Sequence, residues 1–437
     1  MKNENTPNPE TNPPIIKEEN HKTKLVKNRT SDFADGAAKG PDSPGFPGEN
    51  ASRNDKEESS EPKESPNEDG AKEKKKGSLK VWLTAAVCTL AVAVCASLYL
   101  ANPNKAGSEI KTRTITMTDL GFDTPVTFKT TCSEEQFNDY LSIIKSTYGE
   151  CNELFDAFNT YDGKTSLKTV NEKAHDQPVT VDEKVIEVLN DSIKAHQVNP
   201  KFDVSQGKLT FLWKQAFDSG ENKLPDAQAI AASINPDSMN AVVVEDNTIS
   251  LTDQQAALDF GAIAKGYTTQ LCADRLQEAG LEYGFLNAGG NVVLIGEKPD
   301  GEDWKVGIQN PDESDSLLLF TTRKPTCLVT SGDYQRYMMV DGKRYSHIID
   351  PDTGYPAAFM RSVTVIHDDS AYCDAMSTAL FCMPVEEGLQ LCKEMNLEAV
   401  FITDKGSLDL TPSLQSAAFD IYLTDGLKDA VKLKENS

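Results

Sequence analysis

DFGAIAKGYTTQLCADRLQEAGLEYGFLNAGGNVVLIGE, residues 259–297, sets the fold class of this chain. Its first half predicts a helix from about Gly261 to Glu278, and Tyr283–Leu286 reads as a buried strand. NVVLIGE predicts a second strand after the paired glycines of Asn287–Asn291. Those glycines permit a positive φ or a close backbone approach, and they also suit a plain tight turn.

The segments on either side continue this alternation of helices and strands. Apolar residues at three- and four-residue intervals predict helices over 134–161, 181–198 and 386–395, and a further helix from about Ala371. Predicted strands lie within 115–131, 239–252, 304–310, 362–367, 399–404 and 419–424. No βαβ period and no internal repeat is visible, so we expect an α+β or mixed α/β fold in a single unit spanning residues 114–432.

The N-terminal part of the chain has a different composition. Residues 1–79 are rich in Pro, Asn, Glu, Lys and Ser, so they cannot bury enough apolar surface to offset their ordering entropy and are expected to be disordered. Residues 81–100 carry no charge, and a helix of about 20 residues crosses a bilayer. We therefore predict a transmembrane helix at 80–101, followed by a linker at 102–113.

The charges beside this predicted span set its orientation. Lysines crowd its N-terminal flank, at Lys72, Lys74, Lys75, Lys76 and Lys80. The positive-inside rule then places residues 1–79 in the cytoplasm and the folded part outside the cell membrane. A cleaved signal peptide is the alternative, but it would begin within the first few residues of a chain.

Charge and cysteine content exclude some classes of function. The formal net charge is −24, and the excess of acid lies after the N-terminal tail. This argues against a nucleic-acid partner, because phosphate contacts need basic patches. Two of the nine cysteines fall in the predicted span, and the other seven show no CxxC pair. We expect those seven to be buried free thiols, because zinc sites and dense disulfide frameworks have other spacings.

Two segments have the residues to bind a phosphate or a metal ion. Asp259–Gly266 is expected to run from a strand into a helix, where backbone N–H groups and Lys265 could meet an anion, although such a segment also serves packing alone. Asp374 and Thr378 lie four residues apart near a predicted helix start, on one face. Their oxygens suit Mg²⁺; alternatively, Asp374 caps the helix and Thr378 bonds back to its own backbone.

A third segment contains a candidate acid–base pair. Residues 330–356 read TSGDYQRYMMVDGKRYSHIIDPDTGYP, in which His347 precedes Asp350 by three residues and a Pro/Gly-rich turn holds the carboxylate. A histidine beside a fixed aspartate can act as a base, and a lone loop histidine can also be structural or exposed. The chain has no GxSxG, HExxH, Walker A or GxGxxG motif. The residues alone therefore indicate a phosphate and Mg²⁺ site, and no reaction.

Taken together and in order, six blocks resemble the FAD:protein FMN transferase family, the ApbE-like flavin transferases. The blocks are FDVSQGKLTFLW (202–213), DFGAIAKGY (259–267), FLNAGGNVVLIGE (285–297), WKVGIQNP (304–311), residues 330–356 and SVTVIHDDSAYCDAMSTALF (362–381). The resemblance runs from about Gly121 to about Thr424. It implies one ApbE-like catalytic unit after the predicted transmembrane helix.

The resemblance also implies roles for individual residues. FAD contacts fall to Phe122, Tyr161, Lys201, Phe202, Asp203, Asp259, Lys265 and Ile349. The metal site falls to Asp374, Thr378 and the backbone carbonyl of Ala262, and His347 matches the histidine that similar enzymes need for transfer. One departure lies at Phe122 and Asp123, where the family usually has Met and Gly.

The activity implied is Mg²⁺-dependent transfer of FMN from FAD to a Thr or Ser hydroxyl of another protein, with release of AMP. By the same resemblance the acceptor flavoprotein carries an Asp-x-x-[Ser/Thr]-Gly-[Ala/Ser]-Thr motif, which this chain lacks. Two other functions stay open. A metal-dependent FAD pyrophosphatase would use water as nucleophile in the same site, and a non-enzymatic FAD-binding module would not need Asp374, Thr378 and His347 together.

Overall fold

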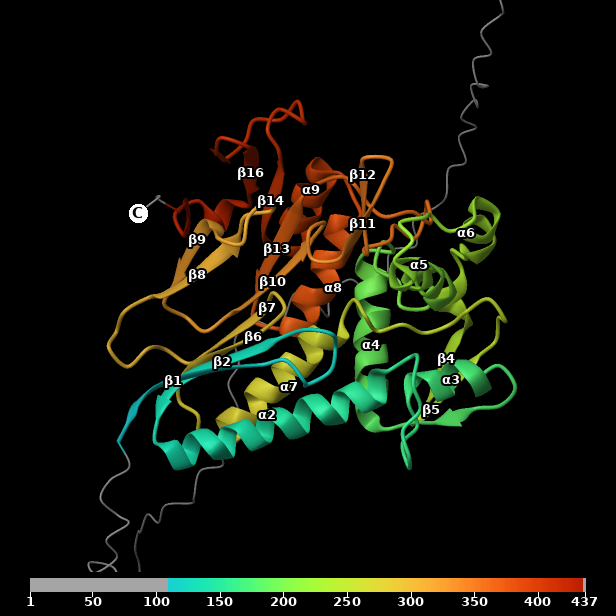
Figure 1. Cartoon of the computed structure of the whole chain (residues 1–437), viewed down its shortest axis with the longest axis horizontal. Helices are drawn as coiled ribbons and strands as arrows, with labels where there is room; N and C mark the ends of the chain where they lie inside the picture. Colours follow the sequence, from blue (N-terminus) through green and yellow to red (C-terminus); the bar gives the residue numbers. More distant parts are fainter. Residues whose placement is uncertain (1–108, 435–437) are drawn as a thin grey trace, which may run out of the picture. The chain divides into compact units, whose positions relative to one another are not determined.

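The computed structural model describes residues 109–434, in which helices and antiparallel strands alternate (Figure 1). The α-helices are α2 (Glu134–Phe155), α3 (Leu167–Lys173), α4 (Glu183–Val198), α5 (Gly207–Ser219), α6 (Ala227–Ser233), α7 (Ala264–Glu278), α8 (Ser370–Phe381) and α9 (Val385–Met395). Two short 3-10 helices are η2 (Ser238–Ala241) and η3 (Asp425–Leu427).

Nine strands form one sheet. Their order across it is β1 (Lys111–Met117), β2 (Val126–Cys132), β6 (Gly284–Ala288), β7 (Asn291–Ile295), β10 (Cys327–Gly332), β13 (Ser362–His367), β14 (Glu398–Asp404), β16 (Phe419–Leu423) and β15 (Leu414–Gln415). Every neighbouring pair in this sheet is antiparallel, which confirms the expectation of a mixed α+β fold without βαβ units.

The remaining strands form three small antiparallel sheets. One contains β17 (Val431–Leu433), β9 (Ser316–Thr322) and β8 (Trp304–Gln309). A second contains β3 (Val179–Thr180), β5 (Thr248–Leu251) and β4 (Val242–Glu245), in which β4 and β5 form the predicted hairpin. The third is the hairpin of β11 (Tyr337–Val340) and β12 (Lys343–Ser346).

Both faces of the nine-stranded sheet are covered, and β14 shows how its sequence achieves this. Ala399 and Phe401 point into a core shared with α2, α7 and α8, which Figure 1 shows together on one face of the sheet. Val400 and Ile402 point into a core shared with the β17–β9–β8 sheet. Because side chains alternate along a strand, burial on both faces requires the unbroken apolar run that residues 399–402 provide.

Two helix ends differ from the sequence expectation for local reasons. The helix predicted over 134–161 ends at Phe155, because the Asp156 carboxylate accepts hydrogen bonds from the N–H groups of Phe158 and Asn159 and so holds a turn. The helix predicted from Gly261 begins at Ala264. Residues 259 and 260 are irregular where a strand was expected, and residues 261–263 form a turn. The segment that was expected to meet an anion therefore begins as a loop that leads into α7.

The transmembrane prediction falls outside this description. Residues 1–79 and 80–101, and the first part of the expected linker, lie outside the described residues. Within 109–434, no helix is both long and apolar enough to cross a membrane.

The seven cysteines of the described region are free and buried, as the sequence predicted. Desolvation raises their thiol pKa values, to about 11 for Cys151 and about 12 for Cys392. At neutral pH these side chains therefore stay protonated and act as small apolar groups in the core.

Helices α7 and α8 approach so closely that position 266 admits only glycine. A Cβ on Gly266 would overlap the Ser370 carbonyl oxygen and lie 2.6 Å from the Asp374 Cβ. Gly266→Ala is therefore expected to destabilise the protein by about 1–3 kcal/mol, measured by denaturant unfolding. Gly149→Ala is the control, because a Cβ there meets nothing within 4 Å and alanine favours helix α2 by about 0.5–1 kcal/mol. Equal stability of the two variants would contradict the contact.

Candidate active site

A cavity of about 1000 Å³ opens where the ends of several elements meet. Its walls come from the turn after β1, the start of α5, the loop before α7, the β6–β7 turn, the segment around β11–β12 and one face of α8. Ten of the residues assigned by resemblance line it: Phe122, Lys201, Asp203, Asp259, Ala262, Lys265, His347, Ile349, Asp374 and Thr378. Their positions span 257 residues of chain, so the fold alone brings them together.

Two of the expected FAD contacts, Phe202 and Tyr161, do not line the cavity. Phe202 is fully buried in the core beneath the cavity, and its carbonyl oxygen is 2.8 Å from His196 Nδ1. The Tyr161 hydroxyl donates to Asp156, which itself lines the cavity. The structure gives neither side chain a place on the cavity surface.

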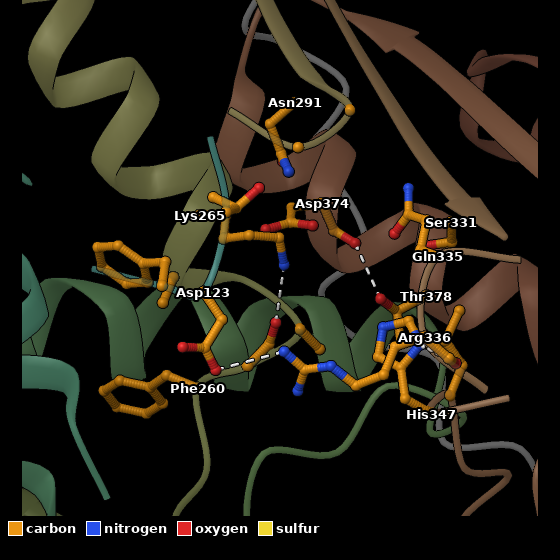
Figure 2. A pocket seen from close by; sticks show the side chains of 18 of the residues that line it. Asp123, Phe260, Lys265, Asn291, Ser331, Gln335, Arg336, His347, Asp374 and Thr378 are labelled. Atoms are coloured by element: carbon orange, nitrogen blue, oxygen red, sulfur yellow. Dashed lines mark hydrogen bonds and ion pairs between the residues drawn. The ribbon is translucent and has the colours of Figure 1, made fainter. Parts of the chain in front are cut away.

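The loop from Asp259 to Lys265 forms one side of the cavity. Asp259 is fixed by the Thr210 hydroxyl at 2.6 Å and the Gly261 N–H at 2.9 Å. Lys265 Nζ donates to the Gly261 carbonyl at 3.2 Å, so its charge stays beside the cavity (Figure 2). This arrangement leaves a cation next to the first turn of α7, which suits an anionic ligand.

Asp374 lies in the interior of α8 and does not cap it. The N-cap is Asp369, whose carboxylate accepts from the N–H groups of Ala371 and Tyr372. Asp374 is 4% exposed, and its Oδ2 accepts from the Gly266 N–H at 2.8 Å. Burial raises the pKa of this carboxyl, which the positive charge of Lys265 partly counteracts.

Thr378 has the contact of an ordinary helix hydroxyl and also the position of a possible metal ligand. Its hydroxyl donates to the Asp374 carbonyl at 3.2 Å, as an ordinary helix hydroxyl does. The same side chain lines the cavity, and Figure 2 shows it on the wall that also carries Asp374. Because the hydroxyl proton is used within the helix, the oxygen lone pairs remain available to a ligand.

The donor set of this wall fits a hard cation. Asp374, Thr378 and Ala262 present a carboxylate, a hydroxyl and a backbone carbonyl to one cavity. Asn291, which is 1% exposed and lines the same cavity, has a side-chain oxygen without a hydrogen-bond partner in the described region. Residues 109–434 hold no group of three His, Cys, Asp or Glu side chains suited to a metal. A Mg²⁺ ion here would rely on mixed oxygen ligands and on phosphate, as this ion commonly does.

His347 is fixed by the backbone of Arg336. The Arg336 carbonyl accepts from the His347 N–H at 3.1 Å and lies 3.2 Å from its Nδ1. A carbonyl can only accept, so Nδ1 carries a proton and Nε2 keeps its lone pair. Burial, with the nearby charges of Lys265 and Arg336, lowers the His347 pKa to about 4. The ring is thus neutral at pH 7 and can accept a proton at Nε2.

The expected partnership of His347 with Asp350 is wrong. The Asp350 carboxylate instead accepts from Lys201 Nζ at 2.7 Å and from the Thr353 hydroxyl at 3.2 Å. Lys201 also pairs with Asp352 at 2.9 Å. Lys201 therefore anchors the turn that follows His347. The sequence could not show this pairing, because Lys201 lies 149 residues from Asp350.

A family model described as the ApbE family matches residues 122–401. The chain belongs to the ApbE family. It is 34% identical over 254 residues to the FAD:protein FMN transferase of Klebsiella pneumoniae (strain 342), which covers 57% of this chain and 78% of that protein. A second relative of the same name, from Vibrio cholerae serotype O1, is 29% identical over 259 residues and covers 58% and 78%. This ApbE-family chain is a transferase, as its relatives are named.

Solved ApbE structures share the fold described above. The ApbE protein of Thermotoga maritima superposes with a TM-score of 0.63 at 24% identity, over 73% of this chain and 99% of that one. The flavin transferase ApbE of Vibrio cholerae gives 0.61 at 24% identity, over 74% and 100%. The mixed α+β architecture is therefore that of ApbE proteins.

The structure adds cavity residues to which the sequence patterns assigned no role, although four of them lie inside segments already singled out, 287–291 and 330–356. They are Asn152, Asp156, Thr210, Asn291, Ser331, Gln335 and Arg336. The sequence did offer a signal for Asn291, because this polar residue directly follows a Gly-Gly turn. Asn152 gave no such signal, because it lies within helix α2, whose amphipathic pattern predicts only a helix. Arg336 lies in the loop before β11, where no pattern indicated its role.

Lys201→Met is expected to destabilise this ApbE-family protein by about 2–4 kcal/mol, because it leaves a buried carboxylate unpaired. The Asp350 side chain is 4% exposed and that of Lys201 22%. Adding Asp350→Asn removes the unpaired charge and should recover most of the loss. Lys194→Met is the control, since its pair with Asp191 is exposed at 52% and 41%. Unfolding by denaturant is the measurement, and a loss no larger than in the control would refute the pairing.

Proposed function

We propose that this protein transfers FMN from FAD to a Thr or Ser hydroxyl of an acceptor flavoprotein, releasing AMP, with Mg²⁺ bound by Asp374, Thr378 and the Ala262 carbonyl. The observation that carries the proposal is the shared cavity. It joins a hard-cation wall, the Lys265 ammonium and a neutral histidine, in a volume large enough for a dinucleotide. The names of its relatives supply the substrate.

The residues divide the work of a phosphoryl transfer between them. The acceptor oxygen forms a bond to the FMN phosphorus, and the bond from that phosphorus to the AMP oxygen breaks. Nε2 of His347 takes the hydroxyl proton, as its neutral state allows. Lys265 offsets negative charge that moves onto AMP. Bound Mg²⁺ supplies charge neutralisation at the diphosphate.

We further propose that the acceptor presents the motif Asp-x-x-[Ser/Thr]-Gly-[Ala/Ser]-Thr, and that residues 80–101 anchor the enzyme with its catalytic unit outside the cytoplasm. The uncharged run at 81–100 and the lysines before it support the anchor. Protease added to intact cells should then degrade the catalytic unit. Protection of that unit until the cells are lysed would refute the orientation.

The transfer itself is tested with purified protein, FAD, Mg²⁺ and an acceptor carrying the motif. A flavin-fluorescent acceptor band that resists denaturation, together with stoichiometric AMP, is the expected result. An acceptor whose target Ser or Thr is replaced by Ala should stay unlabelled. Release of free FMN and AMP, with no labelled acceptor, would instead identify a pyrophosphatase.

Thr378→Val keeps the side-chain shape and removes the oxygen from the metal wall. The Mg²⁺ concentration for half-maximal transfer is expected to rise about tenfold or more, because one proposed ligand is lost. Thr269→Val is the matched control: that hydroxyl also donates to a carbonyl four residues earlier, at 2.7 Å, but lies outside the cavity. The control should lose stability and keep its Mg²⁺ dependence. An unchanged requirement in folded Thr378→Val would remove this residue from the site.

His347→Ala is expected to lower the rate of transfer by about two to four decades while FAD affinity changes little. The reason is that Nε2 is the neutral proton acceptor of the cavity. His196→Ala is the comparison, because that ring lies outside the cavity and bonds to a core carbonyl. Single-turnover transfer and FAD titration measure the two quantities. A rate for His347→Ala near that of His196→Ala would leave His347 without a role in proton transfer.

A further inference from the structure

An ion pair spans the cavity at a place that the proposed chemistry does not use. Arg336 Nη2 lies 3.3 Å from Asp123 Oδ2, and the two residues are 213 positions apart. Both line the cavity. Figure 2 shows the Arg336 side chain extending from the side of His347 and Thr378 toward Asp123 on the opposite side. The guanidinium therefore reaches into the space where a ligand would lie.

The backbone around Asp123 is held in an unusual conformation that aims this carboxylate. Phe122 and Asp123 have φ values of +57° and +50°, in the left-handed region that non-glycine residues seldom adopt. The turn is fixed because the Phe122 N–H donates to the Asn152 side chain at 3.1 Å. Consecutive residues in this region are strained, so the turn is maintained by its surroundings.

The charges of the cavity make Arg336 one of two cations available to a ligand. Five aspartates and four Lys or Arg residues line it. Lys201 pairs with Asp350 and Asp352, and Lys214 pairs with Asp218 outside the cavity. Lys265 and Arg336 remain, and the only acid paired with Arg336 in the described region is Asp123. Both cations are therefore available to a diphosphate that enters this acidic space.

We propose that Arg336 is a substrate-binding residue that exchanges Asp123 for the diphosphate of the incoming dinucleotide. The pair is exposed, at 47% for Arg336 and 76% for Asp123, so it contributes little and separates easily. A phosphate carries more charge than a carboxylate and accepts two guanidinium N–H groups at once. Asp123 is the resting counter-ion and competes with the substrate. This inference rests on the FAD-binding part of the proposed function, because FAD supplies the diphosphate.

The exchange takes place beside the proton acceptor. The Arg336 carbonyl fixes both the backbone and the ring of His347, while its side chain reaches for the phosphate. A diphosphate bound by Arg336 therefore lies within one side-chain length of the segment that positions His347. Substitutions that keep the backbone leave the His347 contact in place and separate the two roles.

The test measures FAD and riboflavin binding to the full-length protein with Mg²⁺, by quenching of flavin fluorescence. Arg336→Gln should weaken FAD binding about ten- to a hundredfold, and Arg336→Lys less. Asp123→Asn should tighten it about three- to tenfold, because asparagine tolerates the left-handed backbone and removes the competing charge. Riboflavin has no phosphate, so its affinity should change less than about twofold in every variant.

Two controls make the outcome decisive. Arg323→Gln breaks an exposed pair with Glu297 outside the cavity and should change neither affinity. In the Arg336→Gln background, Asp123→Asn should have no further effect. Wild-type FAD affinity in Arg336→Gln, or equal losses for FAD and riboflavin, would overturn the inference. Wild-type protein that binds FAD but labels no acceptor would overturn the proposed function and leave this inference standing.

Discussion

The site depends on one buried hydrogen bond, from the Gly266 N–H to the Asp374 carboxylate. A carboxylate removed from water needs a donor, and here the donor is a free N–H in the first turn of α7. The bond holds α7 against α8 at a distance that only glycine permits. It thereby fixes the relative places of Lys265, on one helix, and Thr378, on the other. The sheet beneath serves chiefly to hold these two helices in register, since α8 packs on β10 and β13.

Much of the secondary structure could be predicted from local sequence patterns. Strands such as β14 were visible because burial on both faces demands an unbroken apolar run. Helix α4 was visible because its apolar residues recur at three- and four-residue intervals. Short elements were missed: α3 and α6 have seven residues each, about two turns, which is too little for a periodic pattern to stand out. Strands β10 and β17 were also not predicted, since their partners lie far away in the chain. Strand β9 and the β11–β12 hairpin were missed as well, although β9 pairs with its neighbour β8 and the hairpin strands pair with each other.

Some of the site residues could likewise be predicted from the sequence and others could not. Asp374, Thr378, Lys265 and His347 could be selected from sequence, because each lies in a motif whose residue types suit phosphate or metal chemistry. Their partners could not. No sequence signal links Asp350 to its partner Lys201, which lies 149 residues away, or Arg336 to Asp123, which lies 213 residues away. A pattern reports what a residue can do, and only the fold decides which charge it meets.

The Arg336 carbonyl closes the base of the β11–β12 hairpin by binding His347, so the ten residues from Tyr337 to Ser346 form a loop whose two ends are fastened together. The far end of the hairpin can therefore vary in sequence and length without disturbing this contact. The tip at Asp341 and Gly342 is exposed and adopts positive φ, so extra residues placed there need not move the histidine. The hairpin is thus a natural position for lineage-specific insertions, or for an engineered epitope, on a surface close to the site.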